Sequence, residues 1–239
     1  SELLQQTNSF LATQGAAPDK TPANQAVVKR APPSHRNLLE KLESLDEASE
    51  EVGFLAEELG FDSLWVYDHF HNVPLPAHEA MFECWTTLAA ISQRTSRIKL
   101  GQMVGCAPYR NPGLLAKITS NIDVMSGGRL IWGVGAGWYD HEFAGYGYDF
   151  PKASVRFAQL EEVITICRLM WTEPEPTFHG RYFHIEGASA PPLPEVPPRV
   201  CIGASGEQIG LPMVGRLADM WNCWYRGRDD WQKRMGIVH

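Results

Sequence analysis

An acid and two imidazoles follow one of the most apolar stretches of the chain. Residues 63–71 read SLWVYDHFH, so Asp68, His69 and His71 come directly after a segment with the composition of a buried strand. Carboxylates and imidazoles are the groups that proteins use to transfer protons and to bind metal ions. A strand that ends in such residues is a candidate site if other strands end in a similar way.

Three further apolar segments end in small or unusual residues. They end in Val104-Gly105-Cys106-Ala107-Pro108, in Gly133-Val134-Gly135-Ala136-Gly137-Trp138 and in Gly203-Ala204-Ser205-Gly206. The carboxyl ends of the strands in a parallel barrel meet at one face, where ligands bind. Taken alone, Asp68 could cap the next segment and His69 could be a hydrogen-bonded core residue. The recurrence at four strand ends favours a site.

Some of these residues have other uses in proteins. The stretch GVGAG is not a dinucleotide fingerprint, because Trp138 stands where the third glycine is needed. Gly206 leads into a predicted helix whose first N–H groups could bind a phosphate, although a capped helix explains the pattern equally well. His179 and His184 belong to a predicted hairpin and are expected to be exposed.

A metal site is the main alternative role for the histidines. His69 and His71 have the spacing by which some barrel hydrolases bind zinc. Further donors exist elsewhere in the chain, at His78, Glu79, His141 and Glu142. A catalytic zinc site also needs ligands from later strands, yet the segments at 199–203 and 220–224 end without such residues at the mouth. We therefore expect no metal and assign no ligands.

Alternating apolar patterns predict βα units and a parallel sheet in an α/β fold. Helical spacing predicts an amphipathic helix from Asn37 to Gly60. Strands are expected at 62–68, 97–104, 129–137, 200–205 and 219–224, separated by helices at 82–95, 112–128, 155–171 and 207–218, with a hairpin at 177–185. A doubly wound sheet and a (β/α)8 barrel both fit, but only five strands are evident where a full barrel has eight.

Composition limits the class of protein and its partners. The chain has 239 residues, 44% of them hydrophobic, and a formal charge of −7, which argues against nucleic acids and anionic membranes as partners. There is no apolar run of about 18 residues and no basic, apolar secretory signal. Five cysteines without a CxxC pair are typical of reduced thiols in a cytoplasmic protein. Residues 1–36 are predicted to be a flexible tail, and residues 37–239 one barrel domain.

The segments, in this order, resemble the luciferase-like monooxygenase superfamily and closely resemble its deazaflavin-dependent oxidoreductase branch. The matching stretches are GFDSLWVYDHFHNVP, FECWTTLAAISQRTSRIKLGQMV, YRNPGLLAKITSNIDVMSGGRL, GVGAGWYDHEFAGYGYDFP and ADMWN. The resemblance implies a (β/α)8 TIM-type barrel, in this chain without evident first and last strands. It also implies coenzyme F-420, or FMN in other branches, and hydride transfer to or from a small organic substrate.

The resemblance also implies roles for individual residues. His69 corresponds to the catalytic histidine beside the reactive C5 of the deazaflavin, and Asp68, which precedes it, is expected to be catalytic as well. A non-proline cis peptide is implied at Met103–Val104, where the backbone would support the ring. The resemblance implies two further sets of cofactor-binding residues. Gly135, Ala136 and Gly137 would line the ring pocket. Ala204, Ser205 and Gly206 would receive the phosphate. His69 could accept a proton or act as an electrostatic partner.

Two functions stay open, because the chain departs from the family pattern. The sugar-phosphate dehydrogenase branch has a catalytic glutamate where this chain has Trp138, and Glu142 is near but not equivalent. In the first, the chain is an F-420-dependent oxidoreductase, either whole or as one part of a longer enzyme. In the second, it is a truncated barrel that does not catalyse, and it either binds a flavin-type cofactor or serves as a structural subunit. Oligomerisation, with a second copy or a partner subunit covering open strand edges, is expected. Apolar surface for it is expected from Trp85, Leu88 and Ile91.

Overall fold

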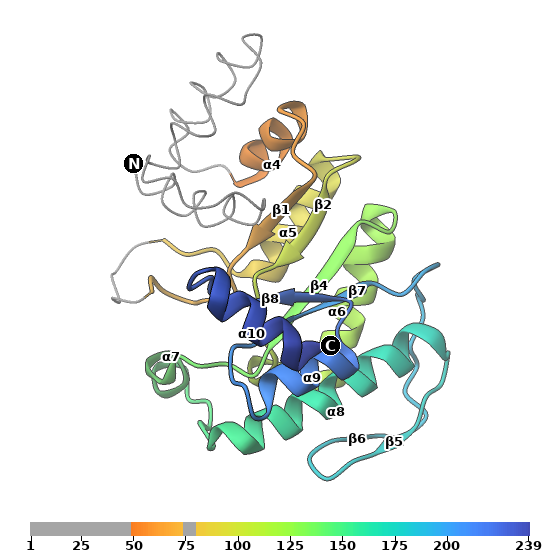
Figure 1. Ribbon diagram of the computed structural model, residues 1–239. Coiled ribbons are helices and arrows are strands. Elements are labelled where there is room, and N and C mark those ends of the chain that lie inside the picture. The colour runs from red at the N-terminus through yellow and green to blue at the C-terminus, as the bar shows by residue number, and fades with distance from the viewer. Residues whose placement is uncertain (1–48, 74–79) are drawn as a thin grey trace.

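The computed structural model describes residues 49–73 and 80–239 (Figure 1). The predicted tail at 1–36, the start of the helix expected from Asn37, and His78 and Glu79 lie outside the described residues. Within the described part, strands and helices alternate as the sequence predicted. None of the described helices is long and apolar enough to cross a membrane.

A curved parallel sheet forms the centre of the molecule (Figure 1). Its main strands are β1 (Ser63–Val66), β2 (Lys99–Gln102), β4 (Leu130–Gly135), β7 (Arg199–Gly203) and β8 (Met220–Asn222), and they lie in this order. A two-residue strand that the sequence did not predict, β3 (Gly105–Cys106), pairs with the end of β4. All of these pairings are parallel, and the result is an α/β fold with part of a (β/α)8 TIM-type barrel.

Helices connect and cover the strands. They are α4 (Ser49–Glu58), α5 (Cys84–Arg94), the 3-10 helix η2 (Ala107–Tyr109), α6 (Pro112–Ser126), α7 (Asp140–Gly145), α8 (Ala153–Thr172), α9 (Gly210–Leu217) and α10 (Arg228–Val238). The ends of α6 follow from its sequence: the Asn111 side chain accepts hydrogen bonds from the first turn, and Gly127 takes the left-handed conformation after the last turn.

Several predicted boundaries were wrong. Helix α9 begins at Gly210 and not at Glu207, because a turn follows the strand first. Helices α7 and α10 were not predicted, since α7 has only six residues and α10 buries only Arg234. The antiparallel hairpin of β5 (Phe178–His179) and β6 (His184–Ile185) confirms the prediction there, and both of its histidines are exposed.

The two faces of the sheet carry different cores. One face contributes large apolar residues, such as Leu100 and Trp132, to the main core beneath the helices. The other face, inside the partial barrel, has a small cluster around Trp65. A Cβ atom on Gly101 would lie 2.5 Å from the Trp65 ring, so this glycine makes room for the indole.

The residues expected to offer apolar surface for oligomerisation belong to the main core instead. Trp85, Leu88 and Ile91 on α5 are at most 4% exposed, so the prediction of surface was wrong for them. Of the five cysteines, all are free thiols, as predicted, and only Cys223 is not fully buried.

Candidate active site at the carboxyl ends of the strands

A buried carboxylate on α7 holds the histidine that follows β1. Oε2 of Glu142 lies 2.7 Å from Nδ1 of His69 and accepts a hydrogen bond from the Tyr109 hydroxyl at 2.9 Å. Its Oε1 accepts the backbone N–H of Phe70 at 2.5 Å and, at 3.4 Å, that of His71. Glu142 is fully buried, whereas the His69 side chain keeps 20% of its surface exposed. The pair therefore has one buried and one accessible member.

An ionised Glu142 makes Nδ1 of His69 the donor of the hydrogen bond between them. Burial alone would raise the pKa of Glu142, but hydrogen bonds from His69, from the Phe70 backbone and from Tyr109 outweigh it and lower the pKa. Burial, together with Cys106 and Glu142, raises the pKa of Tyr109, which stays a donor. An ionised carboxylate only accepts hydrogen bonds, so Nδ1 of His69 carries a proton, and Nε2 takes no part in this bond.

Three aromatic rings lie close to the His69 imidazole. Tyr67, Trp138 and Tyr139 each present a ring at 6.1–6.2 Å from the imidazole in an edge-on arrangement. Trp138 is 61% exposed. A small organic molecule that contacts His69 would therefore lie against aromatic surface.

Asp68 is an anchor between segments. It is 3% exposed, and its two oxygens accept hydrogen bonds from both terminal nitrogens of Arg110 at 2.7 and 2.8 Å. The same carboxylate accepts the Cys106 backbone N–H at 2.8 Å and the Cys84 thiol at 3.2 Å. Arg110 also binds Glu83, the N-cap of α5, at 2.7 Å. These contacts indicate that Asp68 positions the end of β1 against β3.

The same cluster has the donor set of a metal site. Ligand atoms of Asp68, Glu83 and Cys84 lie within 4.8 Å of one another. The guanidinium of Arg110 already supplies the positive charge to the two carboxylates. Burial would lower the pKa of Arg110, but Asp68 and Glu83 raise it above its ordinary value. This cluster is therefore an ion-pair network.

The peptide bond between Met103 and Val104 is cis, as the resemblance implied. The Val104 side chain packs against the ends of β4 and β7. A Cβ atom on Gly203 would lie 2.4 Å from Cγ2 of Val104, and a Cβ atom on Gly135 would lie 3.1 Å from it. These two glycines are register partners, so the segment after β2 closes over a pair of strand ends that have no side chains.

Buried contacts also fix the segment after β4. Gly137 has a φ of +74°, and a Cβ atom there would lie 2.8 Å from the sulfur of Cys106. The Ala136 carbonyl accepts a hydrogen bond from Nε of Arg156 at 3.2 Å, and this buried guanidinium lies 3.9 Å from the centre of the Phe150 ring. Arg156 and Phe150 thus support the glycine segment from behind.

The segment after β7 is the most open of the four. Ala204 is held to β8 by its N–H, which donates to the Asn222 carbonyl at 3.1 Å, and by its carbonyl, which accepts from the Trp221 indole at 2.8 Å. Ser205 is partly buried and Gly206 is exposed, with no atom within 4 Å of a Cβ built there. Backbone between β7 and α9 is therefore free to contact a ligand.

The structure brings the predicted residues of four strand ends to one edge of the sheet, but their roles stay predictions. Sequence reasoning did not predict a positioning role for the residues that hold them in place, which are Tyr109, Arg110, Glu142 and Arg156. Of these four, only Glu142 could have been suspected from the sequence, because it is an acid in the first turn of the helix after the glycine segment.

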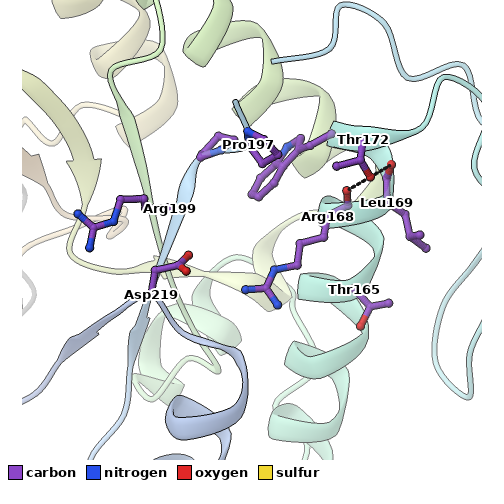
Figure 2. Close-up of a pocket in the computed structure, with 9 residues that line it drawn as sticks. Thr165, Arg168, Leu169, Thr172, Pro197, Arg199 and Asp219 are labelled. Carbon is purple, nitrogen blue, oxygen red and sulfur yellow. Dashed lines mark hydrogen bonds between the residues drawn. The ribbon is translucent and has the colours of Figure 1, made fainter. Parts of the chain in front are cut away.

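A hollow of about 580 Å³ lies at the opposite, amino end of the sheet (Figure 2). Arg168 of α8 and Arg199 and Asp219, at the starts of β7 and β8, line it. Two of these side chains serve the fold: Asp219 accepts the Val200 N–H at 2.8 Å, and Arg168 donates to the Leu217 carbonyl at 2.7 Å. None of the predicted site residues lies there.

Comparisons with known proteins identify the family and the fold of the chain. The sequence model of one family, described as luciferase-like monooxygenase, matches residues 26–238. An F420-dependent glucose-6-phosphate dehydrogenase from Gordonia bronchialis is 34% identical over 192 residues, 77% of this chain and 55% of that protein. A solved F420-dependent secondary alcohol dehydrogenase, in complex with an F420-acetone adduct, superimposes with a TM-score of 0.64 at 26% identity, over 73% of this chain and 52% of that chain.

A more distant solved structure shares the fold. The coenzyme F420-dependent tetrahydromethanopterin reductase from Methanopyrus kandleri superimposes with a TM-score of 0.69 at 22% identity, over 81% of this chain and 57% of that chain. The present chain spans about half the length of the curated relatives it matches.

Proposed function

This chain belongs to the luciferase-like monooxygenase family, and we propose that it carries the cofactor side of an F420-dependent oxidoreductase that acts on a small organic molecule. The names of its relatives support F420. FMN is the alternative cofactor that we propose. A location in the cytoplasm is part of the same proposal. The observation that carries it is the His69–Glu142 pair, which holds Nδ1 of the histidine while its side chain stays 20% exposed at the edge where the four strand ends meet.

The residues at this edge fit a flat, anionic cofactor. Val104 and the side-chain-free ends of β4 and β7 offer a surface for a ring, and exposed backbone at Gly206 offers N–H groups for a phosphate. We assign ring contacts to residues 103–104 and 135–137 and phosphate contacts to residues 204–206. When bound, F420 would supply the hydride chemistry of the reaction.

The chain's own residues would handle the proton. Nε2 of His69 would accept the hydroxyl proton as an alcohol is oxidised, or return it in the reverse direction. Glu142 would stabilise the resulting imidazolium through Nδ1, and Tyr109 and the Phe70 backbone would keep that carboxylate ionised. Asp68 would position the strand end through Arg110 and would not react.

Titration with F420, followed by quenching of tryptophan fluorescence and with FMN in parallel, tests this function. We expect saturable binding of F420. His69→Ala is expected to weaken it severalfold and to reduce alcohol oxidation by about a hundredfold, the size of a lost acid–base group. His184→Ala on the exposed hairpin is the matched control. A folded protein that binds neither cofactor would overturn the proposal.

A second candidate is a barrel that binds the cofactor without catalysis. Its support is the open sheet of the described residues, in which β1 and β8 are the two edge strands. Binding of F420 without turnover of alcohols or sugar phosphates would favour this candidate. Adding a second protein, or measuring the mass of the complex in solution, would then show whether a partner completes the barrel.

A further inference from the structure

We propose that His71 and His141 form a binding site for a divalent transition-metal ion at the rim of the strand-end site. Nε2 of His71 lies 3.2 Å from Nδ1 of His141, and the two rings are 5.1 Å apart at an angle of 83°. Two nitrogens that bind one zinc ion tetrahedrally at about 2.0–2.1 Å are about 3.3 Å from each other. The spacing of the facing nitrogens matches that geometry.

His71 is already oriented as a ligand. Its Nδ1 lies 3.1 Å from the carbonyl oxygen of Asn72. A carbonyl only accepts, so Nδ1 carries the proton and the lone pair of Nε2 points toward His141. Histidines that bind metals commonly donate their second N–H to a carbonyl or carboxylate in this way, which fixes the tautomer and the ring.

His141 is held beside His71 by aromatic packing. Its ring stacks on Tyr139 with centroids 5.8 Å apart and an angle of 23°, and Tyr139 also meets the His71 ring edge-on at 5.5 Å. Without an ion, Nδ1–H of His141 donates to Nε2 of His71. A bound ion would take both lone pairs as the His141 proton moves to its solvent-facing Nε2. Water would fill the remaining coordination positions, and imidazole pairs suit Zn²⁺, Ni²⁺ and Cu²⁺.

This site is separate from the acid–cysteine cluster around Arg110 and does not depend on the proposed redox function. It joins two segments that also carry the catalytic pair, because His71 is two residues after His69 and His141 directly precedes Glu142. An ion there would cross-link the strand end to α7.

The full chain, prepared without a histidine tag, is titrated with Zn²⁺ by calorimetry at neutral pH. We expect one equivalent to bind, with an affinity at least tenfold weaker in His71→Ala and in His141→Ala. His184→Ala is the matched control, because it removes an exposed histidine from the β5–β6 hairpin, which lies across the molecule from α7 (Figure 1). Thermal unfolding of each variant verifies that it is folded.

A second measurement counts the ligands. Electron paramagnetic resonance of one equivalent of Cu²⁺ should show two coupled imidazole nitrogens in the parent and fewer in either single variant. The proposal fails if Zn²⁺ affinity is the same in the parent and both variants, if the control loses as much affinity as they do, or if the parent binds no ion.

Discussion

Buried charges are fully hydrogen-bonded at both ends of the sheet, but the carboxyl end also has a partly exposed polar side chain held by one of them. At the amino end, Arg129 donates hydrogen bonds from all three guanidinium nitrogens to the Thr95 hydroxyl and to four backbone carbonyls, those of Ser92, Thr95, Ile98 and Ser126, at 2.6–2.9 Å. Glu57 accepts the N–H groups of residues 96–98 in the same region. At the carboxyl end, His69 donates a hydrogen bond to Glu142 from Nδ1, and its other ring nitrogen takes no part in this bond.

This difference distinguishes residues that stabilise the fold from residues that can contact a ligand. A charge whose hydrogen-bonding groups are all used inside the protein stabilises the fold and has nothing left for a ligand. A charged or polar group held from one side by a buried partner is both fixed and available. The two ends of the sheet can therefore be told apart by mutation.

The largest effect is expected at the amino end. Arg129→Met removes the donors for four buried carbonyls, and we expect the free energy of unfolding to fall by about 3–5 kcal/mol. Urea denaturation measures it. Arg168→Met is the control at the same end, because Arg168 donates only to the Leu217 carbonyl and should cost about 1 kcal/mol. Equal losses in the two variants would contradict the distinction.

At the carboxyl end, Glu142→Gln should affect activity more than stability. The amide would present an N–H to Nδ1 of His69 and force its proton to Nε2, where the lone pair is needed. We expect turnover to fall about a hundredfold, and the free energy of unfolding by less than about 2 kcal/mol. Steady-state kinetics with F420 and an alcohol measures the first effect. Glu161→Gln, in an exposed ion pair with Arg216, is the control; unchanged turnover in Glu142→Gln would remove the pair from the mechanism.

The stabilisation that Glu57 contributes at the amino end should depend on pH. Burial would raise its pKa, but the backbone N–H groups of Ile98, Arg97 and Ser96 outweigh that and lower it from 4.5 to about 2. A lowered pKa means that the stabilisation is complete above the ordinary value and is lost as the pH falls from 4.5 toward 2.

Glu57→Gln should therefore cost about 2 kcal/mol of unfolding free energy at pH 7 and much less near pH 2. Urea denaturation at several pH values measures the difference between variant and parent. Glu58→Gln, an exposed neighbour on α4, controls for the loss of one charge. A difference that does not change with pH would show that the carboxylate charge is not what matters at Glu57.

The smallest effect is expected at the glycines. A Cβ atom on Gly135 requires Val104 to move by only a few tenths of an ångström, so Gly135→Ala should weaken F420 binding about fivefold, or about 1 kcal/mol. Gly203→Ala, with a contact of 2.4 Å, should weaken it more. The fluorescence titration compares them, and the reverse order would argue against Val104 as the surface beneath the ring.

The sequence predicted the periodic part of the fold and the chain-local part of the site. Strands β1, β2, β4, β7 and β8 were recognisable because apolar runs and the helices between them repeat. The cis bond at Met103–Val104 came from the family resemblance and not from periodicity. Helix α10 was missed because its only buried residue is Arg234, which leaves no apolar stripe to detect.

Long-range partners could not be predicted. Asp68 was expected to act in catalysis, but its contacts with Arg110 and Cys106 depend on how β1 and β3 pack, and a single sequence does not encode that directly. Glu142 was noted only as a metal donor and as a neighbour of the glycine segment. Its pairing with His69, 73 residues away, emerges only once α7 is placed after β4.

The strands lie in the sheet in the same order as in the chain, and this has a consequence for how the protein is made. During synthesis each new strand meets a partner that has already emerged, so the sheet can grow in the direction of translation. The pairing of Ile131 with Arg199 closes the longest stretch of chain between neighbouring strands, with α7, α8 and the hairpin inside it. We expect β7 to dock late, and the glycine pair at Gly135 and Gly203 to form only then. A newly made chain would gain most of its helices before it could bind a cofactor.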